Sequence, residues 1–150
     1  MDLILWRHCD AEPGEPDLAR KLTAHGARDA RRMARWLGER LPEDCRILVS
    51  PAVRTQQTAA ALGRDFETCD AIAPGARVEA VLAVARWPAA PNPVLVVGHQ
   101  PTLGETAAFL LGNLEMEWSM KKGAVWWLVK PPRERRHAVV LKLAVAPGDV

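Results

Sequence analysis

The sequence predicts a three-layer α/β/α sandwich with a mainly parallel central sheet and a hairpin at one edge. Short apolar runs alternate along the chain with longer segments of helical periodicity, which is typical of an α/β layered fold. Of the 150 residues, 49% are apolar, which is enough for one hydrophobic core. Two strand-like runs close the chain with no helix between them, and they predict the edge hairpin. Because no linker or repeat interrupts the pattern, we expect residues 1–150 to form a single domain.

The expected strands are short apolar runs bounded by turn residues. They cover residues 2–7, 46–49, a short stretch within 66–72, 94–97, 124–129 and 138–146. The charged segment 130–137 is expected to be the turn that joins the last two strands. Residues 9–21 contain Pro13, Gly14 and Pro16, and they are expected to form a loop.

Four helices are expected between these strands, and three of them carry signals for their first residue. Thr23 is a typical N-cap, and Ser50 before Pro51 predicts a cap followed by proline at the first helical position. Thr102 and Glu105 have the spacing of a capping box. The expected helices run from Thr23 to Leu41, Ser50 to Gly63, Arg77 to Trp87 and Thr102 to Gly112.

Composition excludes several classes of function. A net charge of +2 is too small for general nucleic-acid binding. The three cysteines are widely spaced and form no Cys-x-x-Cys pair, so we expect neither a zinc site nor any other cofactor. No run approaches the ~20 apolar residues of a membrane span, and the start of the chain does not resemble a signal peptide. The expected setting is a reducing cytoplasm, with no membrane partner.

Polar residues follow three of the predicted strands. Arg7 and His8 come at the end of the first strand, Arg54 lies just beyond the second, and His99 follows Gly98 after the fourth. The carboxyl ends of parallel strands meet at one edge of a sheet, which is where open α/β sheets bind ligands. A single His8 would be expected to be a structural core histidine, but its companion segments favour a shared site.

Two arginines, two histidines and two helix N-termini in one place predict a pocket for a phosphate group. A neutral imidazole can attack phosphorus and hold the phosphoryl group as phosphohistidine. Arg7, Arg54 and an N–H of His99 would match the negative charge of the transition state. This chemistry requires no metal ion.

These segments resemble the histidine phosphatase superfamily, whose hallmark is Arg-His-Gly after the first strand. The segment Ser50-Pro51-x-x-Arg54-x-x-Gln57-Thr58 and the pair Gly98-His99 also match it. Chain length and the segment 20–26, Arg-Lys-Leu-Thr-Ala-His-Gly, look like the small phosphohistidine phosphatases of the SixA type. The resemblance covers residues 2 to about 112. It implies His8 as nucleophile, Arg7 and Arg54 as phosphate ligands, and His99 as the second histidine.

The same resemblance implies that Arg20 adds to the phosphate site, and it exposes two departures. Cys9 stands where the family has glycine, so its side chain either crowds the pocket or accompanies an ordinary backbone conformation. Its neighbours Arg7 and His8 would favour a thiolate, so a redox switch is a second interpretation. The slot that carries an acid in many relatives holds Ala71, with Asp70 one position away. A missing acid favours phosphohistidine, because its P–N bond is labile.

The sequence therefore predicts a metal-independent phosphatase that acts on a phosphohistidine protein, for example a phosphotransfer domain. Only a short segment lies between Arg54 and His99, which leaves no room for a large lid and predicts an open site. One alternative is a small-molecule phosphomonoesterase of the same superfamily. Another is a non-catalytic module that binds phosphohistidine. The roles of Trp118, Trp126 and Trp127 stay open between core packing and partner binding.

Overall fold

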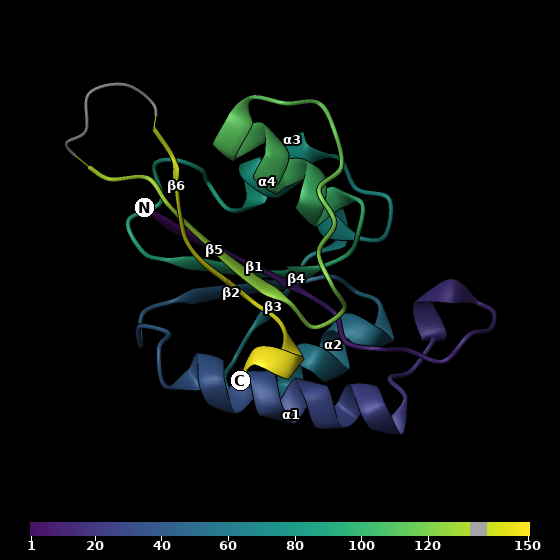
Figure 1. Ribbon diagram of the computed structural model, residues 1–150. Helices are drawn as coiled ribbons and strands as arrows, with labels where there is room; N and C mark the ends of the chain where they lie inside the picture. The colour runs from purple at the N-terminus through teal and green to yellow at the C-terminus, as the bar shows by residue number, and fades with distance from the viewer. Residues whose placement is uncertain (133–137) are drawn as a thin grey trace.

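A computed structural model describes residues 1–132 and 138–150, which build one six-stranded sheet covered by helices on both faces (Figure 1). The strand order is β3-β2-β4-β1-β5-β6. Strands β3, β2, β4 and β1 run parallel, and β5 and β6 are antiparallel additions at the β1 side. The strands are β1 (Asp2–Arg7), β2 (Arg46–Val49), β3 (Glu67–Thr68), β4 (Val94–Gly98), β5 (Val125–Val129) and β6 (Val140–Val145). The predicted layered fold with its edge hairpin is confirmed.

Two helices cover each face of the sheet (Figure 1). The helices are α1 (Ala24–Gly38), α2 (Val53–Ala60), α3 (Val78–Val84) and α4 (Thr102–Gly112). On the α1 side, Trp6 and Ile4 pack with Met33 and Leu37 of α1. On the α4 side, the alternate residues of β1, such as Leu5, pack with Val81 of α3 and Leu103 of α4. Because β1 and β4 are buried on both faces, their sequences are continuous apolar runs.

Two of the predicted strands have the bounds expected for them, and others are shorter. The bounds of β1 and β2 are those predicted, whereas the strand expected within 66–72 contains only the two residues of β3, followed by a 3-10 turn at Asp70–Ile72. Helix α1 ends at Gly38 instead of Leu41. The turn expected at 130–137 falls mostly outside the described residues, because the structure describes nothing of 133–137. None of the described helices is long and apolar enough to cross a lipid bilayer.

The predicted caps of α2 and α4 are wrong, although Thr23 does cap α1. Helix α2 begins at Val53, so Ser50 and Pro51 precede it. Thr102 is the first residue of α4 instead of its cap, and its hydroxyl donates to the carbonyl oxygen of Ala76 (2.6 Å). Ser50 likewise contacts His99. Both hydroxyls therefore make tertiary contacts that override the local capping signal.

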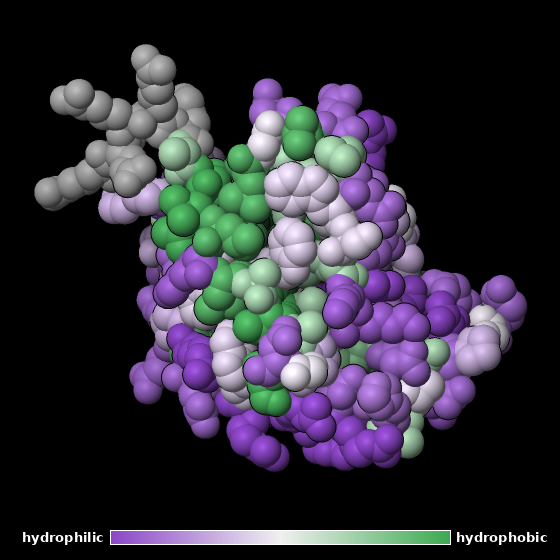
Figure 2. Space-filling view, in the orientation of Figure 1, coloured by the Kyte–Doolittle hydropathy of each residue, from purple (hydrophilic) through white to green (hydrophobic). Residues whose placement is uncertain are grey.

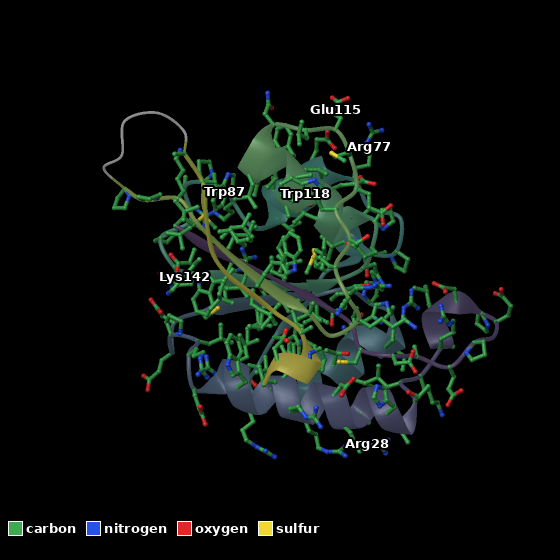
Figure 3. The ribbon with its side chains drawn as sticks, viewed as in Figure 1. Arg28, Arg77, Trp87, Glu115, Trp118 and Lys142 are labelled. Carbon is green, nitrogen blue, oxygen red and sulfur yellow. The ribbon has the colours of Figure 1, made fainter. Side chains whose placement is uncertain are left out.

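The adjacent tryptophans of β5 point to opposite faces of the sheet. Trp127 is buried in the α1-side core, and Trp126 packs on the α4 side against Trp118, with ring centroids 6.3 Å apart. Core packing is thus the role that the structure gives these rings. On the surface, apolar side chains gather over the β5–β6 hairpin, whereas the outer side of α1 is hydrophilic (Figure 2). Arg28 projects from that side of α1, away from the sheet (Figure 3).

Candidate active site

The two predicted site histidines lie next to each other at the carboxyl ends of β1 and β4. Those strands are paired in parallel, with Arg7 opposite Gly98, so the following residues His8 and His99 leave the sheet together. Their ring centroids are 5.3 Å apart. Both side chains are nearly enclosed, with His8 8% and His99 3% exposed. The pairing of distant strands thus brings together residues that lie far apart in the sequence.

The His8 ring is held in one orientation by its own backbone. Its Nδ1 lies 2.7 Å from the carbonyl oxygen of Cys9, which can only accept, so Nδ1 carries the proton. Burial, against the opposing effect of the Cys9 hydrogen bond and with help from the charges of Arg54, Arg7 and Arg20, lowers the pKa of His8 to about 4. At neutral pH the ring is therefore uncharged, and its Nε2 carries a free lone pair.

His99 is fixed from both sides. Its Nδ1 lies 3.3 Å from Nη2 of Arg54, and because a guanidinium only donates, Nδ1 must accept. In the neutral ring Nε2 then carries the proton, which it donates to the hydroxyl oxygen of Ser50 (2.7 Å). Burial, together with the nearby charge of Arg54, lowers the pKa of His99 to about 3. His99 therefore holds Arg54 as a neutral acceptor.

Arg54 is the second residue of α2, and its side chain is buried between His99 and the loop before α1. Its Nη1 donates to the carbonyl oxygen of Asp17 (2.9 Å), and its Nη2 pairs with the Asp17 carboxylate (3.1 Å). Arg7 donates from Nη1 to the carbonyl oxygen of Met120 (2.7 Å). The Nε atoms of both arginines are buried without an acceptor among the described residues. Because unsatisfied buried donors are costly, they indicate that this site accommodates an acceptor such as an anion.

The loop before α1 supplies a carboxylate that links two of the predicted phosphate ligands. Asp17 accepts from Arg54 and also from Nη1 of Arg20 (3.0 Å), and these hydrogen bonds lower the pKa of Asp17. Arg20 lies at the rim, where its Nε donates to the carbonyl oxygen of Glu12 (2.8 Å). The structure thus connects Arg20 to Arg54 through Asp17. His8 and His99 are themselves almost covered, so little of either ring reaches the surface.

Other residues of the segment that contains Arg54 serve as supports. The hydroxyl of Thr58 accepts from the backbone N–H of Cys9 (3.2 Å) and donates to the carbonyl oxygen of Arg54 (2.8 Å). Gln57 accepts from the backbone N–H of Leu22 (2.7 Å), which ties the loop before α1 to α2. The four side chains of this motif therefore hold different parts of the site: Ser50 contacts His99, Arg54 contacts Asp17, Gln57 contacts Leu22, and Thr58 contacts Cys9.

The comparisons with known proteins identify the family of this chain. Residues 3–75 match the family described as histidine phosphatase superfamily (branch 1). A phosphohistidine phosphatase SixA homolog from Haemophilus influenzae is 33% identical over 130 residues, which cover 75% of this chain and 79% of that protein. The chain belongs to the histidine phosphatase superfamily, in its SixA-type branch.

Solved structures of the SixA type superpose over most of the chain. A chain assigned as phosphohistidine phosphatase SixA from Nakamurella multipartitia is 31% identical, with a TM-score of 0.74, over 85% of this chain and 83% of that one. The protein histidine phosphatase SixA complexed with tungstate is 26% identical, with a TM-score of 0.79, over 99% of this chain and 98% of that one. The resemblance in the sequence thus extends to the fold.

Cys9, in the glycine slot of the superfamily, does not crowd the pocket. Its backbone does not adopt the left-handed conformation, and its side chain is fully buried. The sulfur lies beside Gly123, which has φ +77° and where a Cβ would approach it to 3.1 Å. Burial raises the pKa of Cys9 to about 12, with Asp29 contributing in the same direction. A buried, protonated thiol argues against the redox interpretation.

The position that carries an acid in many relatives is Ala71 in this chain, with Asp70 next to it. Ala71 lies in the 3-10 turn after β3, and it and Asp70 are both exposed. Among the described residues, Asp17 supplies the one carboxylate that hydrogen-bonds to a predicted site residue in this pocket. The same part of the chain contains no group of three His, Cys, Asp or Glu side chains that could hold a metal ion.

Sequence reasoning missed Asp17 and Ser50 as parts of the site. Ser50 directly follows a buried strand, as His8 and His99 do, and that position was the available signal. Asp17 lies in a stretch rich in Pro and Gly, and its spacing of three residues from Arg20 is too common to indicate a contact with Arg54. Both residues hydrogen-bond to site residues that the sequence did predict: Ser50 to His99, and Asp17 to Arg54.

Proposed function

We propose that this chain is a phosphohistidine phosphatase that uses His8 as its nucleophile. The observation that carries the proposal is the state of His8. Its Nδ1–H is occupied by the Cys9 carbonyl, and its low pKa leaves Nε2 unprotonated at neutral pH. An imidazole in this state is ready to form a bond to phosphorus. The proposal is also supported by His99, whose ring centroid lies 5.3 Å from that of His8, and by Arg54 and Arg7, whose charges act on the His8 ring.

In the first step, Nε2 of His8 forms a bond to phosphorus while the P–N bond of the substrate breaks. The phosphoryl group moves to His8, and the released histidine of the substrate takes up a proton from water. Arg7 and Arg54 stabilise the negative charge on the equatorial oxygens, and the unsatisfied Nε donors of both arginines support this role. Positive charge is thus supplied by side chains, with no metal ion required.

In the second step, water attacks the phosphoryl group on His8, the P–N bond to His8 breaks, and phosphate leaves. The net reaction converts phosphohistidine and water to histidine and phosphate. His99 keeps Arg54 in place through its Nδ1 in the free enzyme. A phosphate dianion beside His99 favours its protonated form, in which Nδ1 would also carry a proton and could donate to a phosphoryl oxygen.

The absence of a proton donor from the acid slot favours phosphohistidine as substrate. Alkyl phosphates have poor leaving groups and require a strong general acid, whereas the P–N bond of phosphohistidine breaks with less proton donation. Asp17 does not fill this role, because two arginines keep it ionised. Support for a protein substrate comes from the relative that is described as a protein histidine phosphatase and was solved with tungstate, an oxyanion mimic of phosphate. A phosphorylated histidine phosphotransfer domain is the partner that we propose.

The test compares kcat/KM for three substrates at one pH: a phosphorylated phosphotransfer domain, an aryl phosphate and an alkyl phosphate. We expect the phosphoprotein to exceed the alkyl phosphate by about two orders of magnitude or more, the range that general acid catalysis supplies. The aryl phosphate should fall between them. Equal turnover of alkyl phosphate and phosphoprotein would favour the phosphomonoesterase alternative. Binding without turnover would favour a non-catalytic module.

A further inference from the structure

A groove outside the phosphate pocket lies between α3, α4 and the segment 113–117. Its volume is about 620 Å³. Three large apolar side chains line it and are exposed, namely Phe109 (41%), Leu114 (43%) and Met116 (49%). Exposed apolar side chains gathered in a groove are typical of a surface that binds another protein.

Carboxylates surround this apolar lining. Four glutamates and one arginine line the groove: Glu79, Glu105, Glu115, Glu117 and Arg77. Arg77 pairs with Glu79 (3.7 Å), and Figure 3 shows Arg77 and Glu115 close to one another at the outer end of the α3–α4 layer. In the part of the chain that the structure describes, the other three glutamates form no ion pair. The groove is therefore negative, so it repels small phosphate esters and attracts basic groups.

The wall formed by segment 113–117 is anchored at both ends. Asn113 adopts the left-handed conformation (φ 52°) that ends α4 and turns the chain back, and the N–H of Leu114 donates to the carbonyl oxygen of Ala108 (3.2 Å). Beyond the wall, the carbonyl of Trp118 lies against Gly104 at a position where any Cβ would collide with it. The groove is thus preformed, which lowers the cost of binding.

Two segments of the chain contribute residues both to the groove and to the phosphate pocket. Pro101, two residues after His99, lines it. Gln100 donates to Glu117 (3.3 Å) and to the carbonyl oxygen of Trp118 (2.9 Å). The same segment continues to Met120, whose carbonyl oxygen holds Arg7. Residues that line the groove are therefore close in sequence to His99 and to Met120, which holds Arg7.

We propose that this groove binds the protein substrate through an amphipathic helix that carries lysines or arginines beside its apolar face. The inference rests on the proposed function and names how its substrate is recognised. The apolar side chains receive the apolar face of the helix, and the glutamates pair with its basic flank. Phosphohistidine on or next to that helix then enters the cationic pocket.

The experiment uses the full chain and two phosphohistidine peptides of the same amphipathic helical design, one with lysines and one with glutamates on the polar flank. We expect kcat/KM for the lysine peptide to be about tenfold higher, within the range by which charge complementarity alters association rates. Glu115→Lys should remove this preference, and Glu43→Lys, a charge reversal at an exposed residue outside the groove, should preserve it. Both variants should hydrolyse an aryl phosphate at the wild-type rate, which also shows that they are folded.

A second pair of variants tests the apolar lining. Leu114→Ser should raise KM for both peptides, whereas Leu141→Ser on β6, equally exposed (40%) but outside the groove, should not. Equal kcat/KM for the two peptides, or equal effects of the groove and control variants, would overturn the groove inference while leaving the proposed function intact. Turnover of aryl phosphate alone, with neither peptide hydrolysed, would overturn the proposed function and the inference with it. If the enzyme self-associates and Leu114→Ser abolishes that association, the groove binds a second copy of the chain, and the proposal is wrong.

Discussion

The phosphate pocket and the acidic groove are neighbours with opposite properties. The pocket is positive and buried, and its residues follow the ends of strands, so the topology of the sheet determines their positions. The groove is negative and exposed, and it consists of helix surface and one loop. Segment 113–120 contributes to both. The difference teaches that the proposed reaction depends on buried positions, whereas the choice of substrate is expected to depend on surface positions that can vary without harm to the fold.

His8→Ala is expected to abolish turnover in the pocket while leaving peptide binding in the groove intact, so it distinguishes the two regions most clearly. Loss of a nucleophile should lower kcat by about 10⁴ to 10⁶, by analogy with other covalent catalysts. Binding of the lysine peptide in the groove should persist, because no residue of the groove changes. Aryl phosphate turnover and peptide binding measured on one preparation test both expectations. Turnover near the wild-type rate would reject His8 as nucleophile.

Arg54→Ala should have the next largest effect. The variant removes one donor to the transition state, and by analogy with an oxyanion donor it should lower kcat by about 10² to 10³. It also releases Asp17 and His99, which Arg54 holds. Arg54→Lys is the matched control, because lysine keeps the charge but lacks the fork that contacts two partners, so partial activity is expected. A loss below about tenfold for Arg54→Ala would contradict the pocket as described.

Most residues of the phosphate pocket could be predicted from the sequence, whereas the residues of the groove could not. Arg7, His8 and His99 lie at the ends of apolar runs, and parallel pairing then places them together. Ser50 and Thr102 were misread as helix caps, because a capping signal is local whereas their hydroxyls bind groups distant in sequence. The groove has no periodic pattern, since its wall follows from the left-handed turn at Asn113, and single exposed apolar residues are common on any protein.

The buried histidines should make the protein less stable in acid. Their pKa values in the folded chain, about 4 for His8 and about 3 for His99, lie below the ordinary 6.5, so protons bind more readily to the unfolded chain. The free energy of unfolding should therefore fall as the pH drops from 6.5 toward these values, by a few kcal/mol for each histidine at about 1.36 kcal/mol per pKa unit. Urea unfolding of the wild type and His99→Gln over this range is the measurement. If the free energy of unfolding changes with pH in the same way for the wild type and His99→Gln, His99 is not buried in its neutral form.

Asp17→Asn should alter anion binding several-fold. The Asp17 carboxylate occupies Nη2 of Arg54, which a phosphate oxygen would need, so removing its charge should tighten inhibition by inorganic phosphate by about threefold to tenfold. The substitution preserves the backbone carbonyl that accepts from Nη1. The inhibition constant at fixed ionic strength measures the effect. Weaker inhibition by phosphate would instead identify Asp17 as a residue that orients Arg54 for binding.

Cys9→Gly should have the smallest effect on activity, less than about twofold, because the buried sulfur packs toward Gly123. Stability should fall by about 1–2 kcal/mol, because the variant loses buried atoms and gains backbone freedom. Thermal unfolding and aryl phosphate turnover provide the comparison. A large gain in activity would mean that the thiol obstructs the pocket after all. Alkylation under native conditions should spare Cys9, which is fully buried, and modify the half-buried Cys45 and Cys69 first.

The pairing of β1 with β4 has a consequence for the protein during its synthesis. His8 leaves the ribosome well before His99, because the strand that delivers His99 is made only after β2, α2 and α3. The central strands cannot close on each other before then, so a nascent chain or a fragment that ends before β4 carries His8 without His99 beside it. Phosphatase activity should therefore appear abruptly with chain length, and complementing fragments split between α3 and β4 should regain activity only when mixed.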